Sequence, residues 1–283
     1  MVSQPIAHPI PYQGSKRKLA QAILSFVPSQ VRVFYEPFAG SAALTLAAAS
    51  THKAEHFALS DSLEPLTGIW TDIIDQPEDL AQAYSDLWHA QHNDPKAFFN
   101  TVRHTFNVHG GSARLLYLLA RCVKNAVRFN AAGEFNQSAD HRRLGTRPER
   151  MTKHILGAHA LLAGRCTISH ADFSISLKQA TNHDLVYLDP PYQGTSGSRD
   201  QRYYQLLDRD RLISELDGLR QRSVPFIVSF DGRCGDRSYG DALPAELGLK
   251  HIELEGGRSS QSTLSGRNER TFESLYLSPD LSG

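Results

Sequence analysis

The segment HDLVYLDPPYQGTSG, residues 183–197, constrains the fold most strongly, because its two prolines fix where an apolar strand must end. The run 185–188 favours a strand, and proline cannot donate a backbone hydrogen bond to a sheet. A residue that precedes proline is also biased toward extended geometry, so Asp189 and Pro190 are both held stiffly. The segment therefore predicts a strand whose end presents an acid in a fixed position.

A second segment, FYEPFAGSAALTLAAAS, predicts a strand, a tight loop and a helix in succession. A further short strand ends at Asp61, about twenty residues beyond Gly40, which is the layout of the first βαβ unit of a nucleotide-binding sheet. The dinucleotide pattern G-x-G-x-x-G is absent, and Glu36 would repel a phosphate. Glu36 suits a cationic ligand such as S-adenosylmethionine, which has no phosphates. The alternative is that Glu36 and Asp61 are acids in surface loops.

The pattern changes between residues 75 and 163, where apolar residues recur every three or four positions. This spacing predicts a mainly helical stretch, including SARLLYLLARCVKNAVRF, with a break at the glycines of NVHGGS. Strand patterns return in RCTISHADF, DLVYLDPPY, PFIVSFDG, HIELEGG and TFESLYLS. We therefore predict an α/β protein whose sheet is built from residues 1–74 and 164–283, with a helical insertion at 75–163.

Composition excludes some classes of protein and leaves others open. The formal net charge is zero, so only local clusters such as HRRLGTRPERMTKH and SKRK suggest an anionic partner; the alternative for each is a solvated face. The three cysteines are widely spaced, which fits neither a disulfide framework nor a zinc site, and we expect no metal. The chain has no apolar run of about 18 residues and no secretory signal at its start, so we expect a cytoplasmic protein with no membrane contact.

The Asp-Pro-Pro-Tyr sequence predicts binding of an aromatic amine. The carboxylate of Asp189 and the carbonyl of Pro190 are two acceptors that can bind both hydrogens of an exocyclic amino group, and Tyr192 can stack on the ring. These contacts favour a nitrogen whose lone pair points toward an incoming methyl group, and the acid stabilises the positive charge that develops. Two alternatives are a polyproline turn without function and a metal ligand, although no partner lies at ligand spacing nearby.

Together, EPFAGSAAL, DPPY and PYQGSKRKL resemble the Dam-like adenine-specific DNA N6-methyltransferases over nearly the whole chain. The segment KNAVRFNAAGEFNQS is similar to the recognition-region pattern of that family. The resemblance implies a Rossmann-like, S-adenosylmethionine-dependent methyltransferase sheet with a mainly helical target-recognition insertion. It also implies methyl transfer to N6 of a flipped adenine in duplex DNA, within a restriction-modification or orphan methylation system.

The resemblance implies roles for individual residues as well. Those expected to bind the cofactor are Tyr12, Gly14, Lys16, Glu36, Pro37, Phe38, Gly40, Asp61, Asp172, Phe173 and Asp189. Those expected to hold the target base are Asp189, Pro190, Pro191 and Tyr192. Those expected to contact DNA are Arg128, Phe129, Asn130, Asn136, Arg142, Arg143 and Arg147. For Phe38 and Phe173 the alternative is a core position, and for Lys16 it is a solvated charge.

The chain departs from the family pattern in two places. Pro11 and Tyr12 stand where the family has lysine and tryptophan, and Ala42 replaces a glycine. The resemblance therefore does not extend to the GATC target of relatives. We expect a monomer that binds double-stranded DNA, with a cognate restriction endonuclease as a further candidate partner. Other hypotheses are methylation of cytosine N4, RNA adenine or a protein glutamine, an inactive DNA-binding relative, and, most distantly, a nicotinamide oxidoreductase.

Overall fold

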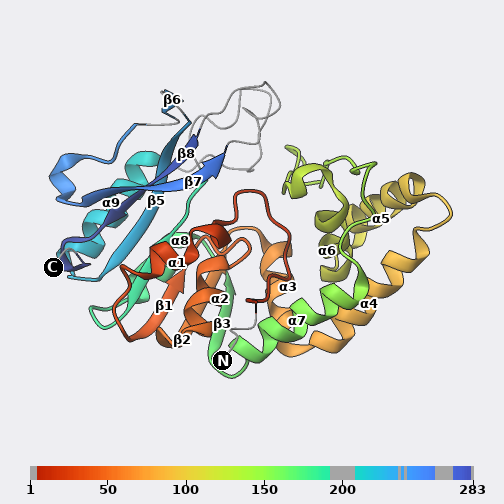
Figure 1. The fold of residues 1–283 in the computed structure, drawn as a ribbon, viewed down its shortest axis with the longest axis horizontal. Coiled ribbons are helices and arrows are strands. Elements are labelled where there is room, and N and C mark those ends of the chain that lie inside the picture. The colour runs from red at the N-terminus through yellow and green to blue at the C-terminus, as the bar shows by residue number, and fades with distance from the viewer. Residues whose placement is uncertain (1–4, 192–207, 235–236, 239–240, 259–269, 282–283) are drawn as a thin grey trace.

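The computed structural model describes residues 5–191, 208–234, 237–238, 241–258 and 270–281. In this part of the chain, one mixed sheet has helices on both faces, which is the α/β architecture expected from the sequence (Figure 1). The strand order is β3-β2-β1-β4-β5-β8-β7, and the short β6 pairs with β5. The strands are β1 (Val31–Glu36), β2 (Ala54–Asp61), β3 (Cys166–His170), β4 (Leu185–Leu188), β5 (Phe226–Cys234), β6 (Arg237–Ser238), β7 (Lys250–Arg258) and β8 (Arg270–Leu277).

The first five strands in this order are parallel, because each is joined to the next along the chain by a helical crossover. β8 then runs antiparallel to both β5 and β7. Helices of the sheet region are α1 (Ala20–Leu24), α2 (Ala43–Ser50), α3 (Glu64–Asp75), α8 (Phe173–Gln179) and α9 (Arg209–Gln221), and the 3-10 turns η1 (Lys16–Lys18), η3 (Ala245–Leu247) and η4 (Pro279–Leu281) lie beside them.

Alternate residues along the central strands belong to two apolar clusters, one on each face of the sheet. In β4, Leu185 and Tyr187 belong to the first cluster, whereas Val186 and Leu188 belong to the second. This follows from the two-residue period of a strand, and all four side chains are buried. The apolar run that the sequence places before the two prolines is therefore the centre of the sheet.

The helical stretch expected between residues 75 and 163 contains α4 (Pro77–Ala90), α5 (Pro95–His109), α6 (Ser112–Arg121) and α7 (Pro148–Leu162), with the turn η2 (Val123–Asn125). In Figure 1, α4, α5 and α6 lie to the right of the sheet, and α7 returns toward it. α7 packs against α2 and α3, and the first apolar cluster runs without a break from the sheet into these helices.

One sequence expectation in this region is wrong. The helix expected to continue through residue 129 ends at Arg121, because Cys122 is extended and Lys124 and Asn125 adopt positive φ. The side-chain amide of Asn125 donates to the carbonyl of Leu119 at 2.8 Å, which satisfies one of the carbonyls at the end of the helix. The chain leaves the helix here to form the irregular segment that carries the recognition pattern.

Two features are absent from the described residues. None of their helices is long and apolar enough to cross a membrane. They also contain no group of three or more histidine, cysteine, aspartate or glutamate side chains placed to hold a metal ion. Cys122 and Cys166 are free thiols.

Candidate active site

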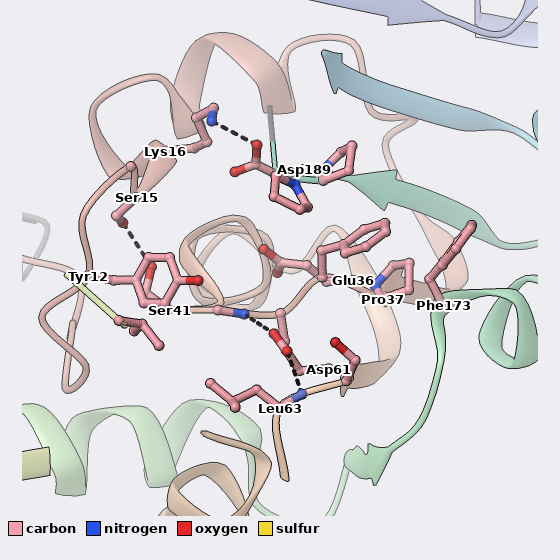
Figure 2. Close-up of a pocket in the computed structure, with 18 of the residues that line it drawn as sticks. Tyr12, Ser15, Lys16, Glu36, Pro37, Ser41, Asp61, Leu63, Phe173 and Asp189 are labelled. Carbon is pink, nitrogen blue, oxygen red and sulfur yellow. Dashed lines mark hydrogen bonds and ion pairs between the residues drawn. The ribbon is translucent and has the colours of Figure 1, made fainter. Parts of the chain in front are cut away.

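A cavity of about 990 Å³ opens at the carboxyl ends of β1, β2 and β4, the edge of an open α/β sheet at which ligands bind. Figure 2 shows three carboxylates along it, with Asp189 at the top, Glu36 in the middle and Asp61 below. The eleven residues that the sequence analysis assigns to the cofactor all line this cavity: Tyr12, Gly14, Lys16, Glu36, Pro37, Phe38, Gly40, Asp61, Asp172, Phe173 and Asp189. Their contacts with a cofactor stay a prediction.

The loop between β1 and α2 turns sharply at Gly40. Its φ of +47° lies in the region that favours glycine, and a Cβ on this residue would meet the ring of Tyr12 at 3.3 Å. The backbone N–H of Gly40 donates to Asp61 at 3.0 Å, and its carbonyl accepts from the indole N–H of Trp70 at 3.0 Å. The loop is therefore fixed on both sides, with its backbone close to the cavity.

Glu36 is the last residue of β1 and is buried, so the surface-loop alternative does not hold for it. Its Oε2 accepts hydrogen bonds from the backbone N–H of Thr45 at 2.9 Å and from the Thr45 hydroxyl at 2.6 Å. Burial raises the pKa of Glu36 to about 8, against the opposing effect of these hydrogen bonds. Glu36 is therefore mostly protonated at neutral pH in the free protein.

Asp61 ends β2 and is partly buried, and it accepts from two backbone N–H groups. Gly40 donates to Oδ2 at 3.0 Å, and Leu63 donates to Oδ1 at 3.0 Å. Burial raises the pKa of Asp61, and these backbone hydrogen bonds oppose the rise. The side chain is held in one orientation, with lone pairs left to accept from hydroxyl groups of a ligand.

Two aromatic rings lie at the side of the cavity. Phe38 stacks on Phe173 with ring centroids 5.1 Å apart, and the guanidinium of Arg211 lies 5.0 Å from the centre of the Phe173 ring. Asp172 forms an ion pair with both terminal nitrogens of Arg211 and accepts from Ser174. Although burial alone would raise the pKa of Asp172, the bonds from Arg211 and Ser174 outweigh it and lower that pKa. Asp172 is thus already engaged in the protein.

The N-terminal segment closes the opposite side of the cavity. Gln13 donates through its backbone N–H to the carbonyl of Asn125 at 3.0 Å, which joins this segment to the helical region. The hydroxyl of Ser15 bonds to that of Ser41 at 2.9 Å. Figure 2 shows Tyr12 opposite Phe173 across the cavity. The segment therefore covers the loop after β1.

Lys16 lies between two carboxylates from distant parts of the chain. Its Nζ is 2.7 Å from Oδ1 of Asp189 and 3.2 Å from Oε1 of Glu273 on β8, and its side chain is only 8% exposed. Burial alone would lower the pKa of Lys16, but these contacts outweigh it and raise that pKa above its ordinary value. Burial raises the pKa of Asp189 and of Glu273, and Lys16 opposes both shifts. The solvated-charge alternative for Lys16 is therefore wrong.

The Asp-Pro-Pro segment follows β4 directly, as expected. Pro190 is buried and Pro191 is partly buried, and both line the cavity. Beneath them, the hydroxyl of Tyr187 bonds to that of Ser229 on β5 at 2.9 Å, which ties the end of β4 to its neighbour. Tyr192, expected to stack on the base, lies outside the described residues.

The recognition-like pattern at residues 128–136 forms a short hairpin. Asn130 builds its turn: its Oδ1 accepts from the backbone N–H groups of Ala132 at 3.0 Å and of Glu134 at 2.9 Å. Phe129 is buried and lines the cavity, while Asn136 is exposed and donates through its backbone to the carbonyl of Arg128. The structure brings the hairpin to the edge of the candidate site; its contacts with DNA stay a prediction.

The arginine-rich run lies on the surface, away from the residues that line the cavity. Arg142 and Arg143 both form ion pairs with Asp140, at 3.5 Å and 2.7 Å. The side chain of Arg142 is nevertheless 87% exposed, and Arg147 is exposed just before α7. The backbone N–H of Arg142 and the side chain of Arg143 lower the pKa of Asp140 to about 2. Arg142 and Arg147 are therefore the members most open to an anionic partner.

A buried arginine holds this run in place. Arg121 donates to the side-chain oxygen of Gln91 at 2.8 Å, to the carbonyl of Asp140 at 2.6 Å and to the carbonyl of Arg143. Its side chain is buried between α4 and the run. Satisfied hydrogen bonds of this kind fix the path of an otherwise irregular segment.

Sequence reasoning missed several residues of the site. Arg211 on α9 and Asp208 directly before this helix line the cavity, and Glu273 reaches Lys16 from β8. One signal was available for Glu273: it is an acid inside the apolar strand pattern TFESLYL. For Arg211, one charge among many on a helix gives no such signal.

Comparison with known proteins gives a consistent result. The family model for D12 class N6 adenine-specific DNA methyltransferases matches residues 12–252. The modification methylase StsI of Streptococcus sanguinis is 26% identical, over 96% of this chain and 43% of that protein. The type II methyltransferase M1.LlaDCHI of Lactococcus lactis subsp. cremoris is 25% identical, over 64% of each chain. The DNA adenine methylase of Escherichia coli strain K12 is 24% identical, over 77% of this chain and 78% of that protein.

Proposed function

The chain belongs to the D12 class of N6 adenine-specific DNA methyltransferases, and from that membership we propose that it transfers a methyl group from S-adenosylmethionine to N6 of an adenine in duplex DNA. It spans about half the length of the first relatives named above, 43% and 64% respectively, so its own activity requires a direct test. The observation that carries the proposal is Asp189, held by Pro190 and Pro191 at the end of β4 and at one end of the cavity.

The side chains of the cavity fit S-adenosylmethionine. Glu36 provides a carboxyl for its cationic end, and Asp61 provides acceptors for ribose hydroxyls. Phe38, which is only partly buried, provides an aromatic surface for the adenine, whereas Phe173 is a buried core residue that supports Phe38 from behind. When bound, the cofactor supplies a methyl group activated by its sulfonium. The volume of about 990 Å³ is near the upper end of the about 300–1,000 Å³ usual for small-molecule sites, which leaves room for a target base as well.

Asp189 and the carbonyl of Pro190 act on the target amine. In our proposal they accept its two hydrogens, which turns the nitrogen lone pair out of the ring plane and toward the methyl group. Formation of the new carbon–nitrogen bond would break the bond between the methyl carbon and the sulfonium sulfur, which would leave as a neutral thioether. The positive charge that develops on nitrogen would be stabilised by the nearby carboxylate until the nitrogen loses one proton. Correct alignment of the two reactants supplies much of the rate.

Access to the amine requires that the adenine leave the stack. In a duplex, N6 is hydrogen-bonded to thymine, so the nucleotide must flip into the cavity at a cost of about a few kcal/mol. The hairpin at 128–136 lies at the edge of the cavity, which supports a role in accepting the flipped nucleotide. Arg142, Arg143 and Arg147 would bind phosphates, which makes affinity salt-dependent without adding sequence discrimination.

We further propose that the two parts of the chain expected from the sequence have different functions. Residues 1–74 and 164–283 form the catalytic part, and residues 75–163 recognise the target. We also propose a cytoplasmic monomer within a restriction-modification or orphan methylation system, with a cognate endonuclease as a candidate partner.

The direct test is incubation with isotopically labelled S-adenosylmethionine and DNA of mixed sequence, followed by nucleoside analysis. We expect label in N6-methyladenine. Label in N4-methylcytosine or in RNA would assign a different amine, and DNA binding without transfer would identify an inactive relative. Expression in a host that lacks adenine methylation, with modified positions mapped in its genome, then identifies the target sequence.

A further inference from the structure

The ion-pair group at the active site has one more carboxylate than the family resemblance assigns. Lys16 contacts Asp189 at 2.7 Å and Glu273 at 3.2 Å, and Glu273 comes from β8, on the far side of β5 from β4. The side chains of Asp189 and Glu273 are 21% and 18% exposed, so solvent screens the three charges only weakly. Glu273 has no role in the mechanism proposed above.

The local fold gives Glu273 this position. It lies opposite Gly232 of β5, next to a register shift between Ser229 and Gly232. A Cβ at Gly232 would approach the carbonyl of Phe272 to 2.9 Å, so the pairing at this point requires glycine. Two glutamates of the neighbouring edge strand β7, Glu253 and Glu255, form ion pairs with arginines, whereas Glu273 points to Lys16. Glu273 is thus directed toward the candidate active site.

The second carboxylate changes the net charge of the ion-pair group. The pair of Asp189 and Lys16 is neutral, and a neutral pair does little to stabilise positive charge on the amine nitrogen of a bound base. With Glu273 ionised, the three groups carry one net negative charge, and Lys16 divides its hydrogen bonds between two acceptors. Attraction between charges is strong at a site with few solvent contacts, so this difference is large where the reaction occurs.

We propose that Glu273 is a positioning residue of the methyltransferase: it binds Lys16 so that Asp189 keeps its negative charge available for the target amine. This inference rests on the proposed function. When the amino group of the base bonds to Asp189, it competes with Lys16 for the same carboxylate. Glu273 then offers the buried ammonium a second acceptor, so that Lys16 is not left buried without a partner.

The test compares Glu273→Gln, which keeps the size of the side chain and removes its charge, with Glu273→Asp, which keeps the charge. Glu255→Gln is the matched control, because Glu255 on the neighbouring strand β7 also forms an ion pair, but with Arg270 and not with Lys16. Single-turnover methyl transfer, affinity for S-adenosylmethionine, affinity for DNA and thermal stability are measured for each. We expect Glu273→Gln to slow transfer about tenfold with both affinities unchanged within about twofold. Glu273→Asp should recover part of the rate, and Glu255→Gln should match the parent.

The pH profile separates this role from a merely structural one. The described titratable groups around Asp189 are Lys16 on η1, Glu36 at the end of β1, Tyr187 on β4 and Glu273 on β8. Glu273→Gln removes a negative neighbour of Asp189, so the acidic limb of the rate profile should move to lower pH while its plateau falls. A structural defect would lower the whole profile without moving the limb.

Several results overturn the inference. They are a parent rate for Glu273→Gln, an unmoved acidic limb, and a rate for Glu273→Asp as low as that of Glu273→Gln with both variants folded. The same assay tests the proposed function separately. If the parent chain forms no N6-methyladenine, the proposed function fails; if the parent is active and Glu273→Gln is equally active, only the role of Glu273 fails.

Discussion

Glu36 should release a proton when the protein binds S-adenosylmethionine. Burial raises the pKa of Glu36 to about 8 in the free protein, so this carboxyl is mostly neutral at pH 7. A cationic group of the cofactor favours the charged form and must bring the pKa down on binding. Glu36 then keeps its proton in the free protein and loses it in the complex. The affinity for S-adenosylmethionine should therefore increase as the pH rises toward the pKa of Glu36 in the free protein.

The size of the effect follows from this pKa. Well below about pH 8, each binding event releases close to one proton, so affinity should rise about tenfold per pH unit, or about 1.4 kcal/mol. The useful window is about pH 5.5 to 6.5, where the α-amino group of the cofactor, with an ordinary pKa of about 8, remains charged. Within that window the charge of the cofactor stays constant, and the comparison with Glu36→Gln isolates the contribution of this carboxyl.

Isothermal titration calorimetry in buffers of different ionisation enthalpy measures the number of protons released. Glu36→Gln is the matched variant, because its amide oxygen can still accept from Thr45 but cannot ionise. We expect about one proton released by the parent and none from this carboxyl in the variant. Equal affinity at both ends of the window, or equal proton release by parent and variant, would refute the reasoning.

Three further predictions concern the loop between β1 and α2 and the residues expected to contact DNA. Gly40→Ala and Gly164→Ala both place alanine at positive φ, so each should lower the free energy of unfolding by about 1 kcal/mol in chemical denaturation. Only Gly40→Ala, whose Cβ would meet Tyr12 at 3.3 Å, should also weaken cofactor binding. Equal cofactor affinities of the two variants in calorimetry would contradict this. Arg142→Ala and Arg143→Ala should weaken binding to all DNA sequences alike, with the larger effect at the more exposed Arg142. Each should reduce the slope of log binding constant against log salt concentration by about one for each phosphate contact that is lost. An altered target sequence with an unchanged slope would argue against that role. Arg128→Ala should instead lose discrimination at one base pair, by about 1–3 kcal/mol in competition binding, and a uniform loss of affinity would count against it.

The parts of the site that could be predicted from the sequence depend on short segments. Neighbouring residues in the chain determine the positions of Asp189, which is followed by two prolines, and of Glu36, which precedes the turn at Gly40. Both could be predicted because strand ends and tight turns have local sequence signals. Parallel strands bring those ends to one edge, so the cavity could be expected once the strands were assigned. The structure places both acids there.

The parts that could not be predicted depend on pairing between distant segments. Glu273 reaches Lys16 only because β8 inserts between β5 and β7, and no local pattern specifies that order. Arg211 meets Asp172 because α9 packs beside α8. The end of α6 at Arg121 could not be predicted for a related reason: Cys122 pairs with Ala139 in an isolated bridge, which is a contact with a segment further along the chain.

The central claim is that Asp189 holds the amino group of an adenine for methyl transfer, and the variant Asp189→Asn tests it most directly. Asparagine keeps the size of the side chain but cannot carry the negative charge. The measurement is the single-turnover formation of labelled N6-methyladenine in duplex DNA, with cofactor affinity measured in parallel. We predict a rate at least about a hundredfold lower with cofactor affinity within a few-fold of the parent. A variant that methylates adenine as fast as the parent would contradict the account.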